Sequence, residues 1–168
     1  WLSGMILAGL AYYMGLALAE AKRAGALGEV PIGAVIVRDG EIIGRGHNFR
    51  EIWRDPTAHA EMLAIKQASD CISNWRLTGS HIYVTLEPCL MCMGALILAR
   101  VDRIVYGPTD PKGGAAGTLY DVSQDSRLNH QIEVVSGVRA EEGGQLLTGF
   151  FSELRRARKA QKKLKKMP

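Results

Sequence analysis

Two short motifs constrain this chain more than any other feature, because each predicts the start of a helix and each carries side chains that bind metals. They are His59-Ala60-Glu61 and Pro88-Cys89-Leu90-Met91-Cys92, about 30 residues apart. Cys89 and Cys92 are three positions apart, so both sulfurs point the same way in the first turn of a helix. The positive end of the helix also favours the thiolate there. The sequence therefore predicts a fold in which two helix starts meet.

The donors in these motifs are the ones that zinc prefers. We interpret His59, Cys89 and Cys92 as ligands of one Zn²⁺ ion, and a site with three protein ligands leaves one position for water, which is typical of catalytic zinc. Glu61 lies roughly 200° from His59 around a helix, so it shares the site only if the helix approaches end-on. A carboxylate beside a zinc-bound water can take its proton and pass it on.

Other interpretations of the cysteines and the histidine stay open. A lone Cys-x-x-Cys is often redox-active or half of a structural zinc ribbon, although no second such pair completes four ligands here. His59 alone would more often be a helix-terminal or core histidine. Cys71 lies outside the pattern, and we predict a buried structural thiol. Three cysteines cannot all pair with one another, which favours a reducing compartment, the cytoplasm.

Apolar periodicity and turn residues predict the order of helices and strands. Asp39-Gly40, between two β-branched runs, is a hairpin signal. The predicted elements alternate in a way that gives an α/β fold, a three-layer α/β/α domain around a central mixed sheet of five strands. Helices are expected at 10–27, 59–68, 88–100 and from about 140, and strands at 32–37, 41–46, 81–86, 103–106 and 132–135.

Charge is distributed unevenly along the 168 residues. Eight of the 21 basic residues lie between Arg155 and Lys166, a stretch without an acid, which leaves 13 basic and 17 acidic residues elsewhere. The net charge of +4 therefore divides into a body of −4 and an arm of +8. A lysine run is more often a solvated helix end. Aromatic side chains among cations, here Phe150, Phe151 and Arg155, also suit an RNA loop, although helical spacing is equally compatible with both phenylalanines in the core.

The first 19 residues carry no charge, which raises the question of a membrane span. No basic segment precedes this run, and the helical pattern continues into Glu20, Lys22 and Arg23. We therefore expect no membrane partner. The predicted organisation is an uncharged N-terminal extension at 1–11, one domain that carries the zinc motifs at 12–158 and a basic tail at 159–168.

Several further segments carry a family resemblance. From about Tyr13 to the basic tail, the chain resembles the bacterial tRNA-specific adenosine deaminases, and His-x-Glu with Pro-Cys-x-x-Cys is the pattern of zinc nucleobase deaminases. The resemblance implies a cytidine-deaminase-like fold, a homodimer and a tRNA anticodon stem-loop as partner. It is carried by Glu29-Val30-Pro31-Ile32-Gly33-Ala34-Val35, Gly46-His47-Asn48, Asp55-Pro56-Thr57-Ala58-His59-Ala60-Glu61, Val84-Thr85-Leu86-Glu87-Pro88-Cys89, Gly113-Gly114-Ala115-Ala116-Gly117 and Phe150-Phe151.

The resemblance also implies roles for individual residues. Glu61 would move protons while hydroxide attacks C6 of adenine, giving inosine and ammonia. Asn48 would contact the flipped base, although an asparagine here could instead stabilise a turn. We hypothesise that Asp110 accepts a hydrogen bond from a 2′-OH, a contact that DNA cannot offer. The other implied groups are the backbone N–H groups of Ala58 and Cys89, facing the hydrated intermediate, and the side chains of Val30 and Leu86, as pocket walls or ordinary core.

Two rival functions follow from the same residues. A deaminase of guanine, cytosine or a free nucleotide would share the zinc site, but it has no need of the cationic last helix or of Asp110. A structural zinc module without turnover would have no need of Glu61. The preferred interpretation is a zinc hydrolase that converts the wobble adenosine of a tRNA anticodon to inosine.

Overall fold

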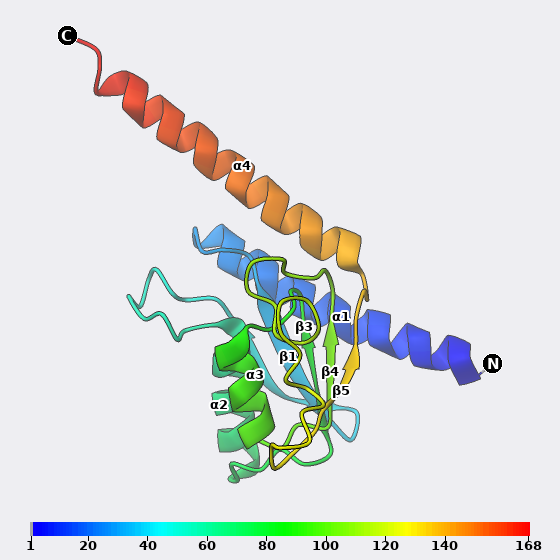
Figure 1. Cartoon of the computed structure of the whole chain (residues 1–168). Helices are drawn as coiled ribbons and strands as arrows, with labels where there is room; N and C mark the ends of the chain where they lie inside the picture. The colour runs from blue at the N-terminus through cyan, green and yellow to red at the C-terminus, as the bar shows by residue number, and fades with distance from the viewer. Residues whose placement is uncertain (1) are drawn as a thin grey trace.

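Five strands form one mixed sheet with helices on both faces in the computed structural model, which describes residues 2–168 (Figure 1). The sheet order is β2-β1-β3-β4-β5; β1 runs antiparallel to β2 and β3, whereas β3, β4 and β5 run parallel. The predicted three-layer α/β/α domain with a mixed five-stranded sheet is confirmed. In chain order the elements are α1 (Leu2–Ala26), β1 (Gly33–Arg38), β2 (Glu41–His47), α2 (Ala60–Ile72), β3 (Ser80–Val84), α3 (Leu90–Leu98), β4 (Arg103–Tyr106), β5 (Glu133–Val135) and α4 (Ala140–Leu164).

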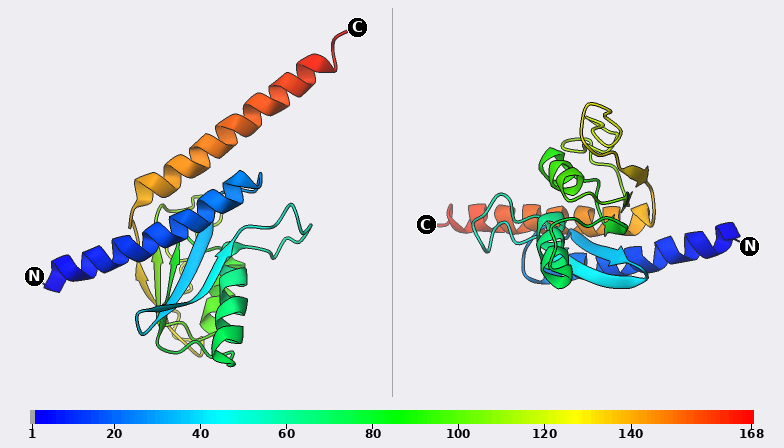
Figure 2. Two further views of the ribbon diagram at one scale, coloured as in Figure 1. Left: turned by 180° about the vertical axis from the view of Figure 1, so that it is seen from behind. Right: turned by 90° about the horizontal axis from the view of Figure 1, so that it is seen from below.

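Two apolar clusters lie between the layers of helices and strands that Figure 2 shows from two sides. On one face of the sheet, Met14 and Leu18 of α1 pack in a cluster with Val35 of β1. On the other face, α2 and α3 bury small and apolar residues against the inward-facing side chains of the strands. Because α2 and α3 cover the same face, the loops that enter these two helices can meet at one edge of the sheet.

The hairpin between β1 and β2 turns at Asp39 and Gly40, as its sequence predicts. Both residues have positive φ, 52° and 76°, which is the conformation that a two-residue type I′ turn requires. At Gly46 in β2 a glycine is needed for space, because a Cβ atom there would lie 2.2 Å from the carbonyl oxygen of Ala60. The bare backbone at Gly46 therefore lets the first turn of α2 lie directly on the strand.

Helix α1 begins earlier than expected, at Leu2 instead of about residue 10. Its first turns extend beyond the sheet, and Met5, Ile6 and Leu7 are exposed there. By length and composition alone, the helix Gly4–Ala26 could cross a membrane, although 33% of its most apolar 18-residue stretch is buried in the structure. The buried part includes Met14 and Leu18, which pack on the sheet as the residues of a core helix do.

The prediction of a buried Cys71 was wrong: the residue is exposed on α2. The buried row of this helix runs through Ala60, Ala64 and Ala68 at a spacing of four, and Cys71 falls one position short of the next member. Small residues in that row allow the close approach of α2 to the sheet. The thiol of Cys71 therefore faces away from the core.

Helix α4 starts against the body and then runs away from it (Figure 1). Gly143 is its one buried residue among the described positions. Glu141 and Glu142 lie in its first turn, and Lys162 and Lys163 in its last, an arrangement that the helix dipole stabilises. The basic arm is therefore a continuous, solvent-exposed helix.

Candidate active site

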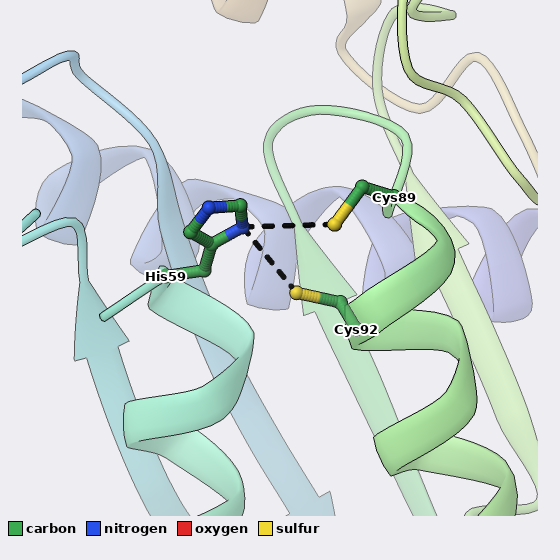
Figure 3. Close-up of side chains that lie close together, drawn as sticks. All are labelled: His59, Cys89 and Cys92. Carbon is green, nitrogen blue, oxygen red and sulfur yellow. Dashed lines mark hydrogen bonds between the residues drawn. The ribbon is translucent and has the colours of Figure 1, made fainter. Parts of the chain in front are cut away.

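The two motifs meet at the starts of α2 and α3 (Figure 3). His59 is the N-cap of α2 and Cys89 the N-cap of α3, both with extended backbone, and Cys92 follows in the first turn of α3. The Nδ1 atom of His59 lies 3.7 Å from Sγ of Cys89 and 3.5 Å from Sγ of Cys92. All three potential ligand atoms lie within 4.8 Å of one another. His59, Cys89 and Cys92 could therefore hold one metal ion.

The electrostatics of this cluster suit a cation. A hydrogen bond with Cys92 and a weaker one with His59 outweigh the opposing effect of burial and lower the pKa of Cys89 to about 4, so this sulfur is a thiolate at neutral pH. The hydrogen bond with Cys89 and burial raise the pKa of Cys92, and the bond with Cys89 raises the pKa of His59. Two cysteine sulfurs and one imidazole nitrogen are the soft and borderline donors that bind transition metals. Three protein ligands leave a position open for a reactant.

Glu61 lies beside the cluster, at the start of α2. Its side chain is 4% exposed, and burial raises its pKa, while a hydrogen bond with Cys92 and the charge of His59 act in the opposite direction. Because the N-terminus of α2 faces the cluster, Glu61 and His59 line the same cavity despite their separation around the helix. A carboxyl group with a raised pKa next to a metal position can both accept and donate a proton.

A cavity of about 210 Å³ opens over the cluster. Five residues that the sequence identified as substrate contacts line it, together with His59, Cys89 and Glu61, whereas Ala58, Cys92, Phe150 and Arg155 do not. Ile32, Arg50 and Glu87 also line the cavity, although the sequence did not identify them as substrate contacts. The full lining is Val30, Ile32, Asn48, Arg50, His59, Ala60, Glu61, Leu86, Glu87, Cys89, Asp110 and Phe151.

Asn48 and Ala58 both have local hydrogen-bond partners. The Asn48 side chain donates to the carbonyl oxygen of Val30 at 3.4 Å and accepts from the N–H of Arg50 at 3.0 Å. Asn48 therefore shapes a turn as well as lining the cavity. Ala58 is buried, and its N–H donates to the carbonyl oxygen of Asp55 at 3.2 Å, so the backbone donor expected there already has an acceptor.

The aromatic and basic residues of α4 are divided between two places. Phe151 lines the cavity while remaining 41% exposed. Phe150 and Phe151 contribute with Arg158 to an adjoining groove of about 420 Å³, which shares Val30 and Arg50 with the cavity. Arg155 is exposed on α4 and lines neither. The groove connects the cavity with the basic arm.

Two buried carboxylates hold the loops around the cavity. Glu29 accepts the N–H groups of Glu51 and Ile52 at 3.0 and 3.2 Å, and Glu87 accepts three N–H groups from the loop that contains Asp110. Both acids are at most 2% exposed. In the sequence, the only indication that these acids are buried is that each stands next to an apolar residue of its motif, Glu29 before Val30 and Glu87 after Leu86.

The fold and this site together define a hydrolytic deaminase, in which a potential metal site and a buried carboxyl group line one cavity. Residues 10–155 match the family model of MafB19-like deaminases. The chain is 56% identical over 151 residues to the tRNA-specific adenosine deaminase of Bacillus subtilis, covering 90% of this chain and 94% of that one. It is 47% identical over 154 residues to the enzyme of the same name from Haemophilus influenzae, covering 91% and 89%. The chain belongs to the family of tRNA-specific adenosine deaminases.

Solved structures agree with this family. A tRNA:A34 deaminase studied for A-to-I editing at the wobble position superposes with a TM-score of 0.78 and 43% identity, over 81% of this chain and 99% of that one. The guanine deaminase of Bacillus subtilis superposes with a TM-score of 0.58 and 36% identity, over 64% and 69%. The fold is thus similar to those of enzymes that act on two different purines.

Proposed function

We propose that this chain hydrolyses adenosine to inosine at the wobble position of a tRNA anticodon. The observation that carries the proposal is the cavity in which Glu61 lies next to His59, Cys89 and Cys92. Relatives that are 45–56% identical and named tRNA-specific adenosine deaminases support the substrate. A purely structural metal module has no use for a buried carboxyl group beside three ligands, because burial of that group without a task only lowers stability.

Zinc is the metal that we assign to this site. His59, Cys89 and Cys92 would hold one ion per chain, and their donor set of one nitrogen and two sulfurs is typical of catalytic zinc. When bound, zinc supplies a charge that lowers the pKa of water, so that a nucleophile is available at neutral pH. The low pKa of Cys89 means that one ligand is already in the form that binds.

Glu61 is the group that we assign to proton transfer. It accepts a proton from the attacking water and delivers it to N1 of adenine as the oxygen bonds to C6. It then moves the proton of the new hydroxyl group to the exocyclic nitrogen, the bond between C6 and that nitrogen breaks, and ammonia leaves. Burial raises the pKa of Glu61, which suits a group that must hold a proton between these steps.

The rest of the cavity would hold the base and its ribose. Val30 and Leu86 supply apolar walls, and Asn48 supplies a polar edge whose own hydrogen bonds keep it in place. The backbone N–H of Cys89, at the start of α3, would face the hydrated purine, with Ala58 supporting the turn before His59. Asp110, which lines the cavity, would accept a hydrogen bond from a 2′-OH, which favours RNA over DNA.

Helix α4 would hold the anticodon arm outside the cavity. Phe150 and Phe151 offer ring faces for unstacked bases, while Arg155 and the lysines beyond it neutralise phosphates. We also infer that the enzyme works in the cytoplasm as a homodimer. The exposed Leu90 and Leu98 of α3 offer an apolar surface for the second copy.

Removing residues 159–168 tests the role of the basic arm. The deletion takes away five lysines, so the affinity for an anticodon stem-loop should fall by about tenfold near 0.1 M salt and its salt dependence should flatten. Fluorescence anisotropy titrations at several salt concentrations measure both. A variant with the five lysines changed to glutamine keeps the length of the arm and should behave like the deletion. Equal salt slopes in all three proteins would show that the arm does not contact RNA.

Substrate choice tests the proposed function itself. The zinc-loaded protein is incubated separately with an anticodon stem-loop, free adenosine and guanine, and the ammonia released is measured. We expect far more ammonia from the stem-loop than from either small molecule, because only the stem-loop is large enough to contact both the cavity and α4. Release from guanine but not from the stem-loop would assign the chain to the guanine deaminases instead.

A further inference from the structure

Glu87 is a buried acid with no role in the chemistry described above. It lies three residues after the end of β3, precedes Pro88, is 2% exposed and lines the cavity. A buried carboxylate is costly unless its oxygens accept hydrogen bonds. The partners of Glu87 therefore indicate what it is for.

All the donors to Glu87 come from one loop. Its Oε1 atom accepts the N–H of Asp110 at 3.1 Å and the hydroxyl of Thr118. Its Oε2 atom accepts the N–H of Ala116 at 3.0 Å and that of Thr118 at 3.1 Å. One carboxylate thus fastens the loop from Asp110 to Thr118 at both of its ends.

The loop is shaped to receive this carboxylate. A Cβ atom on Gly114 would lie 2.4 Å from the Glu87 carboxyl group, so only glycine leaves room for it. The Asp110 side chain is fixed in turn, because its Oδ1 atom accepts the N–H of Lys112 at 2.9 Å. The backbone of Asp110 is held by Glu87 and its side chain by the loop, and Asp110 lines the cavity.

We propose that Glu87 is a positioning residue that holds Asp110 at the rim of the cavity and thereby sets the preference for ribose over deoxyribose next to the target adenosine. The inference rests on the proposed function, in which Asp110 accepts a 2′-OH. Only a side chain with two acceptor oxygens can accept all four of these hydrogen bonds. Glutamine has the same shape, but it turns an NH₂ group toward N–H donors and so releases part of the loop.

Kinetics on two substrates test the inference. One is an RNA anticodon stem-loop, and the other is the same RNA with 2′-deoxyribose at the two nucleotides flanking the target. The ratio of kcat/KM values for the two substrates is measured in the wild type, Glu87→Gln, Asp110→Asn and the double variant. We expect each single variant to lower the ratio by about tenfold, the value of one lost hydrogen bond, and the double variant to lower it no further.

A matched control is Glu29→Gln, because Glu29 is also a buried acceptor of backbone N–H groups but holds the opposite loop. It should lower kcat/KM equally on both substrates, and its effect should add to that of Asp110→Asn. Zinc content and a thermal melt establish that each variant is folded. If Glu87→Gln does not accumulate, Thr118→Val, which deletes one exposed donor to Glu87, should change the ratio in the same direction.

The inference fails if Glu87→Gln, or Thr118→Val in its place, leaves the ratio at the wild-type value, or if the effects of Glu87 and Asp110 add. It also fails if the wild type does not distinguish the two substrates. Failure of the proposed function has a different signature, because no inosine would then form on either substrate.

Discussion

Changing Glu61 to glutamine lowers kcat/KM for an anticodon stem-loop by about 100- to 10,000-fold, the usual contribution of a general acid and base, and leaves one zinc ion per chain. Glutamine fills the same space next to Cys92 but cannot carry the proton from water to the purine. Rates of inosine formation and metal analysis by mass spectrometry measure the two effects. Glu41→Gln, the same chemical change at an exposed position of β2, should leave both at the wild-type value.

The same variant has an effect on stability with a defined sign. Burial raises the pKa of Glu61 in the folded metal-free protein, so protonation favours folding. The resulting stability is fully present below the pKa of an unfolded glutamate and is lost as the pH rises through the raised folded value. Glu61→Gln should therefore unfold at a higher denaturant concentration than the metal-free wild type at pH 7, with a smaller difference at pH 4. Equal midpoints at pH 7 would contradict the buried charge.

Changing Cys92 to serine removes both bound zinc and activity. Cys92 is buried, its Sγ lies 3.5 Å from Nδ1 of His59, and a serine hydroxyl does not replace a thiolate as a zinc ligand. Deamination should fall to background, and the zinc content after dialysis should fall from one ion per chain to nearly none. A chelator should abolish wild-type activity in the same way, and added zinc should restore it.

Cys71→Ser is the matched control for that variant, because it removes an exposed thiol of α2 and leaves the cluster intact. Zinc content and activity should both stay at the wild-type level. If Cys92→Ser kept a full complement of zinc, the assignment of Cys92 as a ligand would be wrong. If Cys71→Ser lost zinc, the ligand set would have to include a cysteine outside the cluster.

Local patterns explain why much of the fold was predictable from the sequence. Asp39-Gly40 specifies a tight turn by itself. The strand β4 begins and ends at the residues that the sequence predicts, 103 and 106. The grouping of the three potential metal ligands was also predictable, because the donors occupy two helix starts whose sequences identify them. His59, Cys89 and Cys92 do lie within reach of one ion.

What could not be predicted depends on contacts between distant segments. Cys71 was predicted to be buried, but the buried face of α2 runs through its alanines. In so short a helix the sequence pattern does not show which of two neighbouring faces packs on the sheet. Glu29 and Glu87 accept hydrogen bonds from loops 22 to 31 residues away, and backbone donors leave no trace in the sequence. Whether Phe150 is a core or an RNA-facing residue depends on how far α4 departs from the body, which its own periodicity does not determine.

The most direct measurement locates the product in the RNA. An anticodon stem-loop with adenosine at the wobble position and at one other loop position is incubated with the zinc-loaded enzyme in water enriched in ¹⁸O, and inosine is mapped by mass spectrometry of the fragments. We expect inosine at the wobble position alone, with one ¹⁸O at C6. Unchanged RNA, inosine at both positions without preference, or inosine lacking the label would contradict hydrolytic deamination of the wobble adenosine.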